Sequence, residues 1–139
     1  MKRKILLLDD DPGVRRMLRR FLEDENYLVS SAANGKEALQ RAEAHDIDLI
    51  LLDLNLTGEN GWQLFERLSS DNPTVPVIII TARSIFPALA SGAGALMEKP
   101  LDLPKLLRTI EELLAEPAAS RQARSNGHAA EFHYLPPKP

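Results

Sequence analysis

The sequence contains no cysteine among its 139 residues. This absence excludes disulfide bonds and thiolate metal ligands, and it is consistent with the reducing cytoplasm. Long apolar runs are also missing. The basic N-terminus leads into only four apolar residues, Ile5–Leu8, whereas a secretory signal needs roughly 7–15 and a membrane span roughly 20. We therefore expect a cytoplasmic protein without membrane insertion.

A strongly basic character is missing as well. The chain has 20 Asp and Glu residues against 17 Lys and Arg, which gives a net charge of −3. No broad basic surface is therefore expected, and direct binding to nucleic acid is not predicted. Hydrophobic residues make up 44% of the chain and charged residues 27%, which is ordinary for a globular protein.

The composition changes after residue 116. Residues 1–116 predict one domain, whereas 118–130 are small and polar, without an apolar period. Phe132–Leu135 then forms an apolar island before a proline-rich end. We expect 117–139 to be either a flexible tail or an extended segment that docks on this domain or on a partner. The tail is too short for an ordinary DNA-binding domain, so we expect output through protein contacts.

Short apolar runs predict the strands. Ile5–Leu8, Ile47–Leu52 and Val77–Ile80 are nearly continuous Leu, Ile and Val, which is typical of parallel strands buried on both faces. Weaker patterns predict strands at Tyr27–Ala32 and Ala95–Glu98.

Amphipathic segments alternate with these strands. Apolar residues at helical spacing lie in Val14–Leu22, in Gly35–Ala44, around Trp62–Leu68 and in Leu103–Leu114. Asp11 and Asp102 are the expected N-caps of the first and last of these helices. Alternating strands and helices predict an α/β fold with right-handed crossovers. The simplest arrangement has five strands and five helices, with its ligand site beyond the carboxyl ends of the strands.

Polar residues follow four of the predicted strands. Asp9 and Asp10 follow the first strand, Asp53 the third, Thr81 the fourth and Lys99 the fifth. Each residue alone would be read as a helix cap or a solvated side chain. Together they would place three carboxylates, a hydroxyl and an ammonium at one edge of the sheet.

This set suits phosphoryl transfer. Clustered carboxylates repel one another unless a cation or protons compensate them, and Mg²⁺ prefers oxygen ligands. Lys99 can bind a phosphoryl oxygen as a point charge, and Thr81 can donate a hydrogen bond to another. Asp53 is the expected nucleophile, forming an aspartyl phosphate.

Four segments carry a resemblance to a known family: Ile5–Pro12, Asp48–Gly58, Val77–Ala82 and Glu98–Pro100. In this order they resemble bacterial two-component response-regulator receiver domains, over about residues 3–115. The resemblance implies a stand-alone, chemotaxis-type receiver with a flavodoxin-like (βα)5 fold. Such a fold is a doubly wound parallel sheet of strand order 2-1-3-4-5.

The resemblance also assigns roles around Asp53, the implied phosphoacceptor. Asp9 and Asp10 would be the acidic pair that holds Mg²⁺ together with Asp53, with Asp10 the more direct ligand. Asn55 would give its backbone carbonyl to the metal. The implied phosphoryl donor is a phosphohistidine on a sensor histidine kinase or phosphotransfer protein, and the domain would catalyse only its own phosphorylation and dephosphorylation.

Further roles follow for the later strands. Thr81 and Lys99 would meet the phosphoryl group and switch the domain, and the Lys99–Pro100 bond is expected to be cis. The side chains of Asn55 and Arg83 occupy positions that tune dephosphorylation in the family, although Arg83 is also readily explained as a surface charge.

Two departures from the family concern the output. The family often has an aromatic residue where this chain has Leu96, and Phe86 is a candidate substitute. The connection from Thr81 to Lys99 is also short, and it contains Pro87 and two glycines. We therefore expect a short or irregular fourth helix starting near Pro87. Signalling would then reach an unknown output protein, or a homodimer, through an altered face of helix four, strand five and helix five.

Two alternative functions remain at this point. The chain could be a receiver-like interaction module that no longer depends on phosphorylation, as the two departures would allow. It could also be a phosphatase, because Asp53 to Thr57 resembles the Asp-x-Asp-x-Thr motif of haloacid-dehalogenase-type enzymes. That chemistry needs a second aspartate as general acid, where this chain has Asn55.

Overall fold

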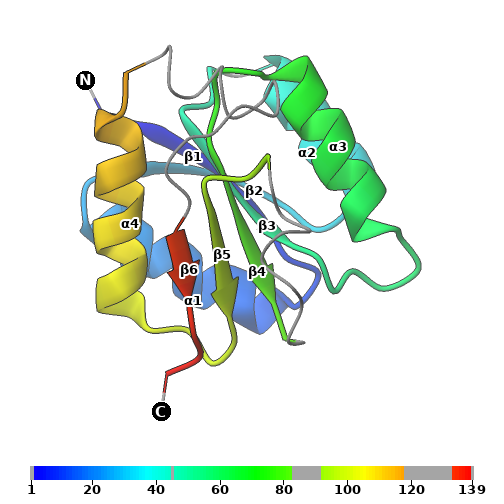
Figure 1. Cartoon of the computed structure of the whole chain (residues 1–139). Helices are drawn as coiled ribbons and strands as arrows, with labels where there is room; N and C mark the ends of the chain where they lie inside the picture. The colour runs from blue at the N-terminus through cyan, green and yellow to red at the C-terminus, as the bar shows by residue number, and fades with distance from the viewer. Residues whose placement is uncertain (1, 45, 83–91, 118–132, 139) are drawn as a thin grey trace.

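A parallel sheet with helices on both faces forms the domain (Figure 1). The computed structural model describes residues 2–44, 46–82, 92–117 and 133–138. Within this part, the elements in chain order are β1 (Lys4–Leu8), α1 (Pro12–Asp24), β2 (Leu28–Ala32), α2 (Gly35–Ala44), β3 (Leu49–Asp53), α3 (Gly61–Asp71), β4 (Val77–Thr81), β5 (Ala95–Glu98), α4 (Leu103–Ala115) and β6 (His133–Leu135).

The strand order is β2-β1-β3-β4-β5-β6, and every neighbouring pair is parallel. The predicted order 2-1-3-4-5 is confirmed. The sixth strand was not predicted as a strand, and it lies on the outer edge of β5.

Alternating side chains of the central strands supply both halves of the core. Ile5 and Leu7 of β1 pack with α1 and α4 on one face of the sheet. Leu6 and Leu8 pack with α2 and α3 on the other face. All four side chains are fully buried. This two-sided burial explains why β1, β3 and β4 are continuous apolar runs rather than alternating ones.

The predicted N-caps are present. The Asp11 carboxylate accepts hydrogen bonds from the backbone N–H groups of Gly13 and Val14 at the start of α1. The Asp102 carboxylate accepts one from Lys105 at the start of α4. Both caps satisfy backbone donors that a helix leaves unpaired at its first turn.

The connection from β4 to β5 was expected to hold the short fourth helix. Its central part, 83–91, which includes Arg83, Phe86 and Pro87, lies outside the described residues. Gly92 and Gly94 belong to a turn that leads into β5, and the Gly94 N–H donates to the carbonyl of Val77.

Part of the tail docks as an extended segment, one of the two alternatives expected from the sequence. Residues 133–138 run along β5, with β6 in register so that Ala95, Leu96 and Met97 pair with successive residues from His133. Residues 118–132 lie outside the described part. None of the described helices has the length and apolar character needed to cross a bilayer.

Candidate functional site

The site lies at the carboxyl edge of the sheet, where four parallel strands end together. Asp9 and Asp10 follow β1, Asp53 is the last residue of β3, Thr81 is the last residue of β4, and Lys99 follows β5. The structure therefore brings together all five residues that the sequence placed at this edge.

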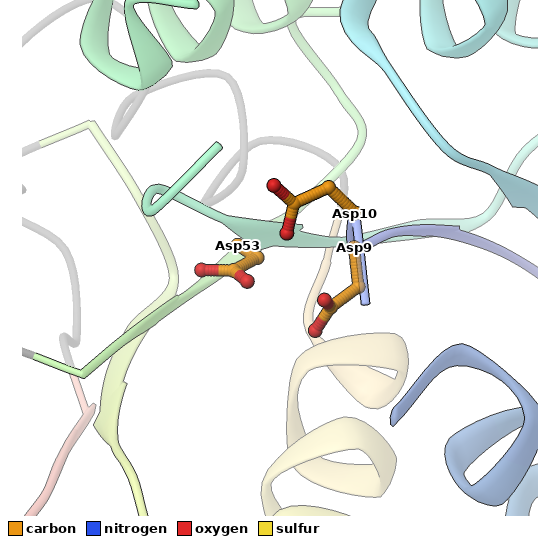
Figure 2. Close-up of side chains that lie close together, drawn as sticks. All are labelled: Asp9, Asp10 and Asp53. Carbon is orange, nitrogen blue, oxygen red and sulfur yellow. The ribbon is translucent and has the colours of Figure 1, made fainter. Parts of the chain in front are cut away.

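Three carboxylates form the centre of the site. One oxygen of each of Asp9, Asp10 and Asp53 lies within 4.8 Å of the other two, and Figure 2 shows the three side chains gathered around the ends of β1 and β3. Asp9 and Asp53 are buried, at 0% and 2% exposure. Buried like charges at this separation need a compensating cation or protons.

Lys99 supplies one compensating charge. Its Nζ lies 3.2 Å from Asp53 Oδ2 and 3.7 Å from Asp9 Oδ2. The Lys99 backbone N–H donates to the carbonyl of Thr81, which fixes this residue beside β4. The Lys99–Pro100 peptide bond is cis, as predicted. A single ammonium cannot neutralise three carboxylates, so the site favours an additional cation.

The raised pKa of Asp9 also indicates that the site favours an additional cation. Burial, together with the nearby Asp53 charge, raises the pKa of Asp9 from 3.8 to about 6, although the Asp11 N–H and Lys99 act in the opposite direction. Asp9 Oδ2 is buried and has no hydrogen-bond partner. A buried carboxylate oxygen that accepts no hydrogen bond and lies among other carboxylates is a suitable ligand for a hard divalent cation, which prefers oxygen ligands.

Asp10 is held as a carboxylate by Thr57, which the sequence marked only as part of a phosphatase-like motif and not as a partner of Asp10. The backbone N–H and the hydroxyl of Thr57 each donate to Asp10 Oδ2 at 2.8 Å. These two hydrogen bonds lower the pKa of Asp10 below its usual value. The sequence signal was available, because Thr57 lies in the loop directly after Asp53, but only the fold brings that loop to Asp10.

Asn55 links the loop after β3 to the end of β4. Its side-chain Oδ1 accepts hydrogen bonds from the Thr81 hydroxyl at 3.3 Å and from the Ala82 N–H at 2.6 Å. The Asn55 N–H donates to Asp53 Oδ1 at 2.9 Å. The resemblance implied a metal-ligand role for the backbone carbonyl of Asn55 and a tuning role for its side chain, but not this link to Thr81.

Arg15 and Leu96 lie close to the site without contributing to the acidic cluster. The guanidinium of Arg15, which was also missed, donates to the backbone carbonyl of Asp9 at 2.6 Å and fixes the end of β1. Leu96, at the position where receiver domains often have an aromatic residue, is fully buried in the core beside α2 and α3.

The model of the response regulator receiver domain matches residues 5–111 of this chain. The chain belongs to the response regulator receiver domain family. The match begins at the second residue of β1, ends within α4 and includes every residue of the site.

Individual relatives agree with this assignment. The transcriptional regulatory protein GlrR of Escherichia coli is 34% identical over 124 residues, which are 86% of this chain and 28% of GlrR. The chain thus spans less than a third of that curated relative. A CheY-like receiver domain protein from Methanospirillum hungatei is 30% identical, with a TM-score of 0.77 and 82% and 94% of the two chains covered.

A third relative, the response regulator TrrA of Thermotoga maritima, has been solved in two complexes. The structure with Mg²⁺ and BeF is 28% identical to this receiver domain, with a TM-score of 0.74 and 81% and 99% of the two chains covered. The structure with the histidine kinase ThkA has a TM-score of 0.75 at the same identity, with 83% and 100% covered.

Proposed function

We propose that this receiver domain is a phosphorylation switch that accepts a phosphoryl group on Asp53 from a phosphohistidine of a sensor kinase or phosphotransfer protein. The observation that carries the proposal is the setting of Asp53. Its carboxylate lies 3.2 Å from the Lys99 ammonium and beside the carboxylates of Asp9 and Asp10. An attacking oxygen, a cationic partner and a metal-binding pair are the parts that phosphoryl transfer requires.

The transfer is a displacement at phosphorus. An oxygen of Asp53 attacks, the bond from phosphorus to the donor imidazole nitrogen breaks, and that nitrogen keeps the electron pair and takes up a proton. Lys99 is close enough to exchange its contact with Asp53 for one with a phosphoryl oxygen. The Thr81 hydroxyl, which donates to Asn55 in this structure, would turn to donate to another phosphoryl oxygen.

The metal of this reaction is Mg²⁺ in our proposal. The carboxylates of Asp9, Asp10 and Asp53 would hold it with the backbone carbonyl of Asn55. When bound, Mg²⁺ neutralises charge on the carboxylates and on the phosphoryl oxygens. The likeness to TrrA, which was solved with Mg²⁺ and BeF, supports this choice, as does the buried Asp9 oxygen that accepts no hydrogen bond.

The partners follow from the same proposal. TrrA forms a complex with a histidine kinase, and we expect a kinase to supply the phosphoryl group here. The domain would act only on its own aspartyl phosphate, would signal through contact with an output protein, and would work in the cytoplasm. Dimerisation through the face of helix four, strand five and helix five is the other expected output route, and α4 is the predicted helix five. Such a dimer would have to include β6, which covers the β5 edge.

The test is phosphorylation of the full chain. We expect incubation with Mg²⁺ and a small acyl phosphate to add one phosphoryl mass to the intact protein. Asp53→Asn should abolish the adduct, whereas Asp71→Asn, at an exposed ion pair on α3, should leave it unchanged. If neither an acyl phosphate nor a phosphorylated kinase gives an adduct, the chain is an interaction module rather than a switch.

A further inference from the structure

The chain's own C-terminal segment covers the edge of β5. In Figure 1, β6 lies beside β5 and between it and α4, and the two strands are parallel. Leu135 is buried at 8% exposure in the core cluster that contains Met97. His133 Nδ1 lies 3.5 Å from Glu112 Oε2 on α4. The segment is therefore packed on the domain rather than simply extended from it.

The contact between β6 and the rest of the domain is small. β6 has three residues, and Leu135 is its one buried side chain, whereas Tyr134 is 45% exposed. A short edge strand with few buried apolar contacts belongs to the parts of a fold that open at low free-energy cost. Undocking of residues 133–138 does not require the other strands to separate.

Two of the contacts converge on the segment that carries Lys99. The Tyr134 hydroxyl donates to Glu98 Oε1 at 2.8 Å, and the Lys138 N–H donates to the Pro100 carbonyl at 2.9 Å. Between these two points lies Lys99, whose ammonium contacts Asp53. The three residues Glu98–Pro100 thus touch the acidic site on one side and the tail segment on the other.

We infer that residues 133–138 are an intramolecular strand ligand of the β5 edge, and that docking of this segment and phosphorylation of Asp53 oppose each other. The inference rests on the proposed function. The docked segment fits Glu98–Pro100 in the arrangement in which Lys99 contacts the Asp53 carboxylate directly. A phosphoryl group placed between the Asp53 carboxylate and the Lys99 ammonium would lengthen this contact, and we expect Glu98–Pro100 to shift with Lys99.

That shift weakens the hydrogen bonds to Tyr134 and Lys138. A ligand that binds one arrangement better than another shifts the equilibrium toward the first, and the coupling is reciprocal. Undocking would uncover the backbone edge of β5, a surface that suits an extended segment of another protein.

The first test is hydrogen exchange on the full chain. Beryllofluoride with Mg²⁺ serves as the phosphoryl mimic. We expect it to speed exchange of the backbone amides of residues 133–138 several-fold, while Mg²⁺ alone leaves them unchanged and β2, at the other edge of the sheet, keeps its rates. Unchanged or slower exchange in 133–138 would overturn the inference.

The reciprocal test measures beryllofluoride affinity. Tyr134→Phe removes only the hydrogen bond to Glu98, and Leu135→Glu removes the buried anchor. We expect both to tighten beryllofluoride binding, within the 5- to 150-fold range of about 1–3 kcal/mol of coupling, at unchanged Mg²⁺ affinity. Leu28→Glu, at an exposed leucine on β2, is the matched control and should change neither. Unchanged or weaker beryllofluoride binding in both tail variants would contradict the inference.

A synthetic peptide of residues 131–139 completes the design. Added to the Leu135→Glu chain, it should occupy the empty edge and weaken beryllofluoride binding again, and no such effect would count against a strand site. A chain that binds no beryllofluoride and accepts no phosphoryl group would refute the proposed function and this coupling together. A chain that is phosphorylated normally while the tail segment does not respond would refute the coupling alone.

Discussion

At the scale of single residues, Asp9 and Asp10 are adjacent carboxylates in opposite electrostatic states. Asp9 is fully buried, and its pKa is raised to about 6, mainly by burial. Asp10 is partly exposed, and two hydrogen bonds from Thr57 lower its pKa. In the metal-free domain the fold is therefore more stable when Asp9 is protonated, whereas it is more stable when Asp10 is charged.

This difference predicts opposite effects of neutralisation on stability. The folded state binds the Asp9 proton more tightly than the unfolded state does, so the stability due to Asp9 is complete below about pH 4 and is lost as the pH rises through about 6. Asp9→Asn should therefore raise the free energy of unfolding of the metal-free chain by about 3 kcal/mol at about pH 7, from about 1.4 kcal/mol for each unit of the pKa difference. The gain should disappear below about pH 4. Urea denaturation in the presence of a chelator, at about pH 7 and below about pH 4, measures the free energy of unfolding of both chains.

Asp10→Asn is the matched comparison. The carboxylate of Asp10 is favoured in the folded state, so its neutralisation should lower stability at about pH 7 and have little effect in acid. A loss of stability in Asp9→Asn at about pH 7 would contradict the charge balance described for the site.

Thr57 is a positioning residue for Asp10. Thr57→Val keeps the shape of the side chain and the backbone hydrogen bond but removes the hydroxyl donor. Because partners of metal ligands typically contribute 10- to 100-fold to affinity, we expect about a tenfold weaker Mg²⁺ affinity by calorimetric titration. Thr109→Val removes a similar hydroxyl on α4, where Thr109 donates to the Lys105 carbonyl, and should leave Mg²⁺ affinity unchanged. Equal affinities in all three chains would exclude this role.

At the scale of elements, the start of α3 fixes the loop that follows Asp53. A Cβ atom on Gly61 would lie 2.5 Å from the Leu54 carbonyl oxygen and within 3.0 Å of two more backbone atoms. Backbone cannot move aside as a flexible side chain can, so glycine allows α3 to approach the segment that carries Asn55.

We therefore expect Gly61→Ala to destabilise the fold by about 1–3 kcal/mol, the usual cost of overpacking, and to weaken Mg²⁺ binding by displacing the loop. Gly92→Ala is the control, because its Cβ would meet only the Phe65 ring at 3.5 Å or more. Thermal unfolding and Mg²⁺ titration of both variants provide the comparison. A Gly61→Ala chain as stable as Gly92→Ala would mean that α3 has room to shift.

The sequence predicted the elements whose patterns are local. β1, β3 and β4 are apolar runs, α1 and α4 have long apolar stripes, and Asp11 and Asp102 mark the helix starts. β6 could not be predicted, because His133–Leu135 is too short to show a period and becomes a strand only against the edge of β5. Its formation depends on a contact between segments far apart in the chain.

At the scale of the whole molecule, the sequence predicted which residues form the site, but it did not predict the hydrogen bonds that link them to other loops and strands. Parallel strands must end at one edge, so the sequence order alone placed Asp9, Asp53 and Lys99 together. The links from Thr57 to Asp10 and from Tyr134 to Glu98 join different loops and strands. Such links depend on side-chain geometry, which no residue pattern encodes.

Metal binding and folding stability of the whole domain should be coupled through pH. Mg²⁺ at 100 times its dissociation constant should stabilise the domain by about 2.7 kcal/mol at about pH 7. Protonation of Asp9 competes with the metal, so at about pH 5 the affinity should be about tenfold lower, and the same Mg²⁺ should add only about 1.4 kcal/mol. Thermal unfolding with and without Mg²⁺ at each pH tests this. Asp71→Asn should keep the full effect and Asp10→Asn should lose it, whereas a Mg²⁺ effect independent of pH would show that Asp9 is not a ligand.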